Sequence, residues 1–112
     1  MVPMDAFLAL AEPTRRTIME MLAASGNLSA SDIYSNFKAT PPAISQHLKV
    51  LREANLVRVE KRAQKRIYYV NPEPMKDLEK WIQQFTKDWQ DRHDRLEEML
   101  KKKLDKKRSE EA

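Results

Sequence analysis

Apolar residues in the first half of the chain recur at helical spacing in short segments that turn residues separate. The pattern predicts one helix over residues 4–10, a second from about 14 to 24, and a third from 29 to 37. Gly26, the only glycine, stands in the turn between the second and the third. The first helix is too short to bury its own apolar face, so we expect it to pack on a partner, while the second and third turn apolar residues toward one modest core.

Residues 40–56 form the most strongly patterned stretch of the chain. Thr40 is a suitable N-cap, and Pro41 follows at the first helical position, where its missing N–H costs nothing. The inward side of the predicted helix is an apolar stripe of Ile44, Leu48 and Leu51. Its outward side is small, hydrogen-bonding or cationic, and consists of Pro42, Ala43, Ser45, Gln46, Lys49 and Arg52. Such a face is typical of a recognition helix, which enters the major groove of DNA and reads base edges.

After residue 56 the helical period gives way to alternation, which predicts two strands within residues 57–70. The connection between them holds four cations: Lys61, Arg62, Lys65 and Arg66. A basic hairpin loop on its own is usually just solvated. Directly after a helix-turn-helix, it indicates a wing that contacts phosphates or the minor groove.

A long final helix is predicted over residues 73–104, after a stop at Asn71 and Pro72. Its apolar residues fall at alternating intervals of three and four, although Arg92 and Lys103 interrupt the seam. This apolar side exceeds what a small core can cover, so we expect a dimer to bury it. The charge-rich end, residues 105–112, is expected to fray.

Composition places the chain among globular proteins. Its 112 residues are enough for one domain, with 34% charged and 41% hydrophobic residues. A net charge of +4 permits a nucleic-acid partner without establishing one. The absence of cysteine excludes disulfides, thiolate metal sites and cysteine nucleophiles. Neither a leader pattern nor an apolar run of membrane length is present, so we expect a cytoplasmic protein with no membrane partner.

Three phrases of the sequence carry a family resemblance. They are A-L-A-E-P-T-R-R-T-I-M-E-M-L (9–22), P-A-I-S-Q-H-L-K-V-L-R-E-A-N-L-V (42–57) and R-I-Y-Y-V (66–70). With them, the chain resembles the ArsR/SmtB family of bacterial winged-helix repressors from residue 8 to about 100. The tail from residue 81 to 100 is similar to the non-metal branch, whose members include autorepressors.

The resemblance implies a mostly α fold with a small β-hairpin: a winged helix-turn-helix with a long C-terminal dimerisation helix. It implies a single domain over 1–112, with a DNA-binding core over 12–72. Dimerisation helices would lie at 1–10 and 73–104. It further implies a homodimeric, sequence-specific transcriptional repressor on a palindromic operator in double-stranded DNA.

From the pattern and the resemblance together we expect two sets of functional residues. The DNA-contacting set is Thr40, Pro42, Ala43, Ser45, Gln46, His47, Lys49, Arg52, Lys61, Arg62, Gln64, Lys65 and Arg66. For His47 either DNA or the helix-turn-helix scaffold is the expected contact. The dimer set is Met4, Phe7, Leu8, Leu78, Trp81, Ile82, Phe85, Trp89 and Leu96.

The sequence departs from the family pattern at three places. The family usually has glycine where Asn55 stands, a tolerable exchange at a helix C-cap. It also has glycine at the wing tip, where this chain has Ala63 and Gln64. Pro41 replaces a common polar residue and removes one possible DNA contact.

Metal sensing is the first alternative. Metal-sensing members carry a Cys-x-Cys pair where this chain has Ser29 and Ser31, and hydroxyls are poor ligands for soft metals. Asp91 and His93 match half of a second family site, and Glu97 one turn later leaves a weak zinc site conceivable. A salt bridge of His93 is the simpler expectation, so we predict no metal and no cofactor. No inducer is readable from the sequence.

Two further hypotheses come from other functional classes. The first is a winged-helix module that binds another protein through the final helix; the basic wing speaks against it. The second is an enzyme, against which stand the missing cysteine, a single glycine and two isolated histidines.

Overall fold

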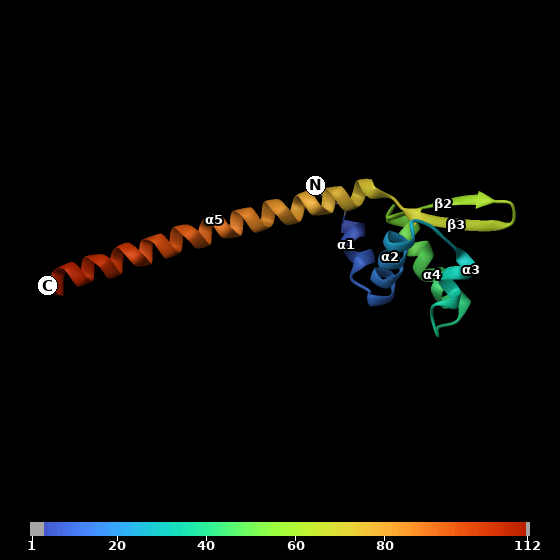
Figure 1. The fold of residues 1–112 in the computed structure, drawn as a ribbon, viewed down its shortest axis with the longest axis horizontal. Helices are drawn as coiled ribbons and strands as arrows, with labels where there is room; N and C mark the ends of the chain where they lie inside the picture. Colours follow the sequence, from blue (N-terminus) through green and yellow to red (C-terminus); the bar gives the residue numbers. More distant parts are fainter. Residues whose placement is uncertain (1–3, 112) are drawn as a thin grey trace. The chain divides into compact units, whose positions relative to one another are not determined.

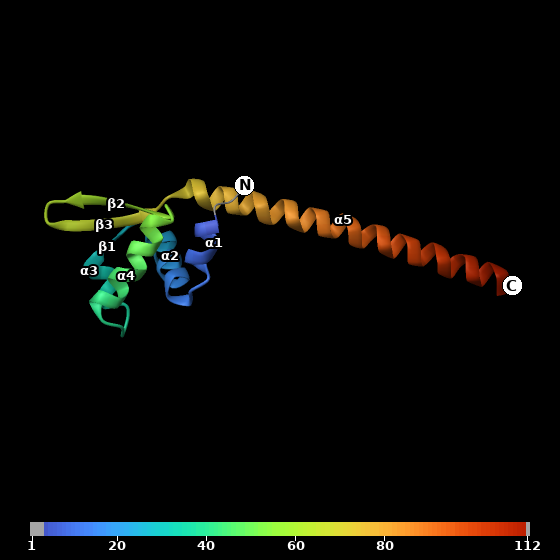
Figure 2. The same cartoon turned by 180° about the vertical axis from the view of Figure 1, so that it is seen from behind.

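The computed structural model describes residues 4–111, with Met4 described by its backbone alone. The elements in chain order are α1 (Met4–Leu10), α2 (Pro13–Ser25), β1 (Leu28–Ser29), α3 (Ala30–Ser35), α4 (Pro41–Glu53), β2 (Val57–Arg62), β3 (Lys65–Val70) and α5 (Pro72–Glu111). Figure 1 shows them along the chain, and Figure 2 shows them from behind. The chain divides into two compact units, one up to Leu78 and one from Glu79 onward. Residues 79–111, the described part of the second unit, are all helical.

The first unit has a single apolar core to which every one of its helices contributes. Its largest fully buried apolar side chains are Ile18, Leu22, Ile33, Ile44, Leu48, Leu51 and Leu56. The inward stripe predicted for α4 is thus confirmed: all three of its residues are buried. This packing leaves the opposite face of α4 exposed.

Local caps fix where the helices begin and end. The Thr40 hydroxyl accepts a hydrogen bond from the Ala43 N–H, and Ser29 and Asp32 form a reciprocal capping box at the start of α3. At the exit of α4, Asn55 has a left-handed φ of 62°, as its place after the helix predicts. The N–H of Leu56 donates to the Leu51 carbonyl at 3.0 Å, which closes the helix end over the core.

The sheet has three strands in the order β1-β3-β2, all antiparallel. The two predicted strands are confirmed as β2 and β3, but β1 was not predicted. The hairpin turn consists of Ala63 and Gln64 alone, so the four cations lie in the strands rather than in a loop. Ala63 takes a φ of 56°, a left-handed conformation that favours glycine.

Helix α5 corrects two predictions. Residues 105–111 continue the helix, so the prediction that the end frays from 105 is wrong for the part the structure describes. The segment consists mainly of good helix formers, and its cations lie near the negative end of the helix dipole. Leu78, expected at a dimer interface, is only 9% exposed and belongs to the core of the first unit.

Candidate nucleic-acid interface

The outward face of α4 lies against the wing. A shallow polar hollow of about 100 Å³ is lined by Ser45, Gln46, Lys49 and Arg52 of α4 together with Arg66 and Tyr68 of β3. Five of these six residues belong to the set predicted to contact DNA. The fold therefore brings the base-reading and phosphate-binding candidates together on one surface.

The pleat of the hairpin divides the four wing cations into two pairs. Lys61 lies opposite Arg66, and Arg62 lies opposite Lys65. Residues paired across antiparallel strands share a face of the sheet, and successive pairs alternate. Arg66 and therefore Lys61 lie on the face that meets α4, whereas the other pair lies on the reverse face.

The reverse face is partly neutralised. The Arg62 guanidinium donates to the Glu60 carboxylate at 3.0 Å, and the Tyr69 hydroxyl donates to the same carboxylate at 3.3 Å. In the part of the chain that the structure describes, neither Lys61 nor Arg66 has an ion pair within 4.0 Å. Cations without a partner are the more available for phosphates, so the sheet distinguishes wing residues that the sequence made look equivalent.

The remaining DNA candidates are exposed, with one exception. Side chains at the start of α4 and at the wing tip face solvent: Thr40, Pro42, Ala43 and Gln64. His47 is half-buried, and its Nδ1 lies 3.3 Å from an Arg15 guanidinium nitrogen and 3.8 Å from a Glu12 carboxylate oxygen. Of the two contacts expected for His47, the structure shows the one with the scaffold.

Arg15 joins α1, α2 and α4, a role that the sequence did not reveal. Its guanidinium donates to the Ala9 carbonyl at 2.6 Å and to the Leu8 carbonyl at 3.2 Å, and it also reaches His47. Carbonyls at the end of a helix have no partner within the helix, so Arg15 caps α1 while it holds α4. No spacing marks such an arginine in advance, because its partners are backbone atoms.

Glu12 caps α2 beside this cluster. Burial raises the pKa of its carboxyl, but N–H donation from Arg15 and Thr14 and the charges of His47 and Arg15 outweigh it and lower the pKa overall. The cap therefore contributes stability above the ordinary carboxyl range and loses it as the pH falls through the lowered value.

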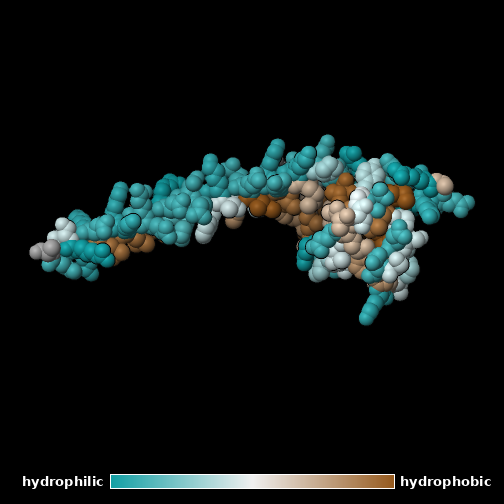
Figure 3. All heavy atoms as spheres, in the orientation of Figure 1, coloured by the Kyte–Doolittle hydropathy of each residue, from teal (hydrophilic) through white to brown (hydrophobic). Residues whose placement is uncertain are grey.

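The second unit carries the other candidate surface. Six apolar residues follow one another at intervals of three or four, except for an interval of seven between the third and the fourth. We name them the α5 stripe: Ile82, Phe85, Trp89, Leu96, Leu100 and Leu104. All six are between 49% and 59% exposed, and Trp81 beside them is 45% exposed. The face of α5 seen in Figure 3 is mostly hydrophilic, and hydrophobic atoms are seen along its lower edge in the first half of the helix and again near the C-terminal end. Because residues 79–111 form a single helix, no other element of the second unit packs on the α5 stripe.

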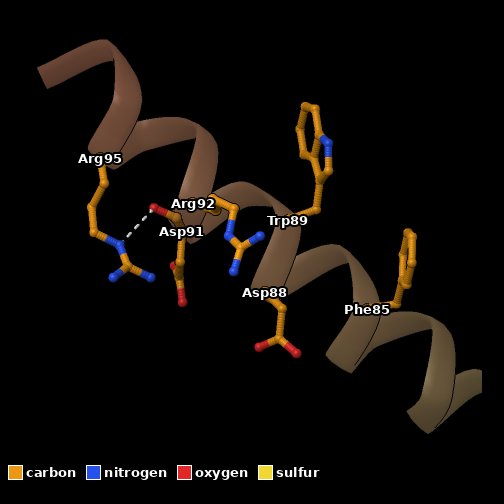
Figure 4. Close-up of a pocket in the computed structure, with 6 residues that line it drawn as sticks. All are labelled: Phe85, Asp88, Trp89, Asp91, Arg92 and Arg95. Atoms are coloured by element: carbon orange, nitrogen blue, oxygen red, sulfur yellow. Dashed lines mark hydrogen bonds between the residues drawn. The ribbon is translucent and has the colours of Figure 1, made fainter. Parts of the chain in front are cut away.

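Aromatic rings dominate the first half of the stripe. Figure 4 shows Phe85 and Trp89 projecting to the same side of the helix, while Asp88 points away from them. Trp81 stacks on Phe85 with ring centres 5.5 Å apart, and Trp89 stacks on His93 at 5.0 Å. These stacks hold the rings in an extended, ordered apolar surface.

Other members of the dimer set and the metal candidates are placed as follows. Leu8 on α1 is exposed and Phe7 is half-buried, whereas the Met4 side chain lies outside the described residues.

His93 forms the expected salt bridge, with Nε2 3.2 Å from a Glu97 oxygen. Within residues 4–111 no three histidine, aspartate or glutamate side chains gather as a metal site, and no helix is long and apolar enough to cross a membrane.

Comparisons with known proteins agree with this geometry. Residues 12–59, which include α4, match the family described as bacterial regulatory protein, arsR family. The chain is 32% identical over 81 residues to the transcriptional repressor SdpR of Bacillus subtilis (strain 168), covering 72% of this chain and 89% of that protein.

Two solved structures resemble the fold. One, an ArsR family transcriptional regulator, has a TM-score of 0.70 at 26% identity and is matched over 77% of this chain and 88% of its own. The other, a possible transcriptional regulator for arsenical resistance, has a TM-score of 0.66 at 34% identity, over 74% and 85%.

Proposed function

Because this chain belongs to the ArsR family and is a DNA-binding transcriptional regulator, not an enzyme, we propose that it is a homodimeric repressor of a palindromic operator. The observation that carries the proposal is the shared surface of α4 and β3, with Gln46 and Arg66 lining one hollow. The repressive direction is taken from relatives such as the transcriptional repressor SdpR.

In the proposed complex, α4 lies in the major groove and the wing lies beside it. The outward residues of its first two turns, Ala43, Ser45 and Gln46, face base edges, with a glutamine amide suited to paired hydrogen bonds with adenine. Lys49, Arg52 and the wing cations contact phosphates, which position the protein without reading sequence.

Two recognition helices are needed for a palindrome, and the α5 stripe supplies the proposed means of holding them together. A second copy brings an identical stripe, so two copies cover each other's aromatic residues. Exposed Leu8 on α1 adds a further apolar contact. An isolated unit would keep only its few contacts with one half-site.

The proposal is tested by selecting bound duplexes from a random library. We expect inverted repeats whose half-site centres lie about 34–36 Å, or a multiple of one turn, apart. Gln46→Ala should weaken binding by about 1–3 kcal/mol at one operator position and little on random DNA. Gln84→Ala, at an exposed glutamine of α5 that is in neither the DNA-contacting set nor the dimer set, is the matched control. Selection of single, unrepeated sites would contradict the palindromic dimer.

The wing gives a second comparison within the same assay. Arg66→Ala should weaken binding to operator and random DNA alike and lower the slope of log K against log salt by about 0.9. Arg62→Ala should have a smaller effect, because Glu60 already pairs with that guanidinium. Equal effects of the two substitutions would show that the pleat does not decide which cations meet phosphate.

A further inference from the structure

The last turns of α5 concentrate the positive charge of the chain. Residues 101–108, which we name the basic end, hold six cations and one acid: Lys101, Lys102, Lys103, Asp105, Lys106, Lys107 and Arg108. This segment carries +5, and the whole chain carries +4, so everything outside it sums to −1. The winged-helix unit, residues 1–78, carries +3 from eleven cations and eight acids, so the basic end is a second and denser positive region of the chain.

The cations of the basic end are helical, exposed and without acidic partners. All six lie within α5 and face solvent. The ion pairs within 4.0 Å among residues 4–111 lie elsewhere, including those of Glu53, Glu60 and Glu97. Six unneutralised charges held this close repel one another, and a bound polyanion would relieve that repulsion.

The arrangement of these charges around the helix limits what the basic end can bind. At 100° per residue, the six cations are spread around most of the circumference, with Leu104 the one apolar residue among them. A helix that lies on a membrane needs a broad apolar face, which this segment lacks. Close pairing with a second basic end would set like charges against each other. Binding to a linear array of backbone phosphates needs neither a broad apolar face nor the close approach of two basic ends.

We propose that the basic end of α5 is a second DNA-binding element, which contacts backbone phosphates without reading sequence. The segment of eight residues is about 12 Å long at 1.5 Å per residue. Over that length duplex DNA presents about seven negative charges, one per 1.7 Å, so the two charge densities are similar. This element rests on the proposed function, because DNA already held by α4 and the wing raises the local concentration of phosphates.

The test compares two triple variants of the same helix. The basic-end variant combines Lys101→Gln, Lys102→Gln and Lys106→Gln. The control combines Lys76→Gln, Lys80→Gln and Lys87→Gln, three exposed lysines outside the basic end. Both remove three charges and keep a good helix former. Each full-length protein is titrated with salt on a selected operator duplex and on a random duplex of equal length.

We expect the basic-end variant to lower the slope of log K against log salt by about 2 to 3 per bound copy, at about 0.9 per phosphate. The loss should be the same on both duplexes, so the ratio of operator to random affinity stays constant. Hydroxyl-radical protection outside the half-sites should disappear, while protection within them remains. The control should keep the parent slope and the parent footprint.

Three results would overturn the proposal: an unchanged slope in the basic-end variant, an equal loss in the control, or no protection outside the half-sites in the parent. Vesicles of phosphatidylcholine and phosphatidylglycerol provide a separate arm. Binding to them that disappears in the basic-end variant would assign the segment to membranes instead. Sedimentation checks that the variant keeps the parent mass. A parent protein that binds operator and random duplexes equally, but whose salt slope still falls in the basic-end variant, would contradict the proposed function and leave the basic end as a DNA contact.

Discussion

Leucines in the two units of this protein have opposite environments. Leu48 and Leu51 of α4 are at most 2% exposed, whereas Leu96 and Leu100 of α5 are 55% and 53% exposed. A leucine buried within its own unit stabilises that unit at any protein concentration. A leucine that only a second molecule covers stabilises an assembly, and its contribution depends on concentration. In the proposed dimer, this difference separates residues that stabilise one copy from residues that stabilise the pair.

The largest predicted effect tests this separation directly. Leu51→Ala should lower the free energy of unfolding of the first unit by about 2–5 kcal/mol, because it leaves a cavity in a packed core. Leu100→Ala should change stability only through association, so its effect should diminish as the protein is diluted. Urea unfolding at several protein concentrations measures both. A dilution-independent loss of equal size in Leu100→Ala would show that the stripe packs within its own chain.

A smaller effect is expected where α4 joins the end of β3. Asn71 is 1% exposed, and its side-chain amide donates to the Asn55 carbonyl at 2.9 Å. Asn71→Ala should cost about 1–3 kcal/mol, because the carbonyl loses its partner. Asn27→Ala, at the turn after α2, is the control. A denaturation midpoint unchanged by Asn71→Ala would mean that water replaces the amide.

The wing tip should respond in the opposite direction. Ala63 has a φ of 56°, which a glycine adopts without strain. Ala63→Gly should therefore raise the stability of the first unit by about 1 kcal/mol, net of the added freedom of the unfolded chain. The thermal unfolding midpoint of Ala63→Gly measures this effect, and the neighbouring Gln64→Gly is the control for the general effect of a glycine. A midpoint for Ala63→Gly below that of the parent would contradict a strained turn.

The smallest effect on operator affinity is predicted for the addition of zinc. Ser29 caps α3 through its hydroxyl, and His93 is occupied by Glu97 and Trp89. Added zinc should change operator affinity less than tenfold, which is about 1.4 kcal/mol of coupling. Operator titrations with chelator and with zinc measure it. A larger effect that disappears in His93→Ala would make the second unit a metal sensor.

Much of the first unit could be predicted from sequence because its signals are local. Thr40, Pro41 and the apolar period of α4 specify that helix within its own residues. Strand β1 has only two residues, Leu28 and Ser29, and exists through pairing with β3 some forty positions later. A periodicity search does not detect a contact of that kind.

The sequence predicts which residues contact DNA, but it does not show how the sheet divides the wing cations between its two faces. The four wing cations are adjacent in sequence, and only the register of β2 with β3 reveals that Arg66 faces α4 while Arg62 faces away. Leu78 continues the apolar period of α5 in sequence, yet packing assigns it to the core of the first unit. Composition alone suggested fraying at the end of α5, because charge was weighed above helix propensity.

We propose that the α5 stripe joins two copies of the protein, and the Trp89→Ala substitution tests this association. Truncating a buried tryptophan costs about 3–5 kcal/mol, enough to shift an ordinary interface toward monomers. Lys87→Ala, at an exposed position about 160° around the same helix from Trp89, is the control. Sedimentation equilibrium should give a dimer mass for the parent and for Lys87→Ala. For Trp89→Ala it should give a monomer mass with weaker operator binding and an intact first unit. A Trp89→Ala protein that remains dimeric, or a monomer that binds the operator as tightly as the parent, would contradict the account and favour another protein as the partner of the stripe.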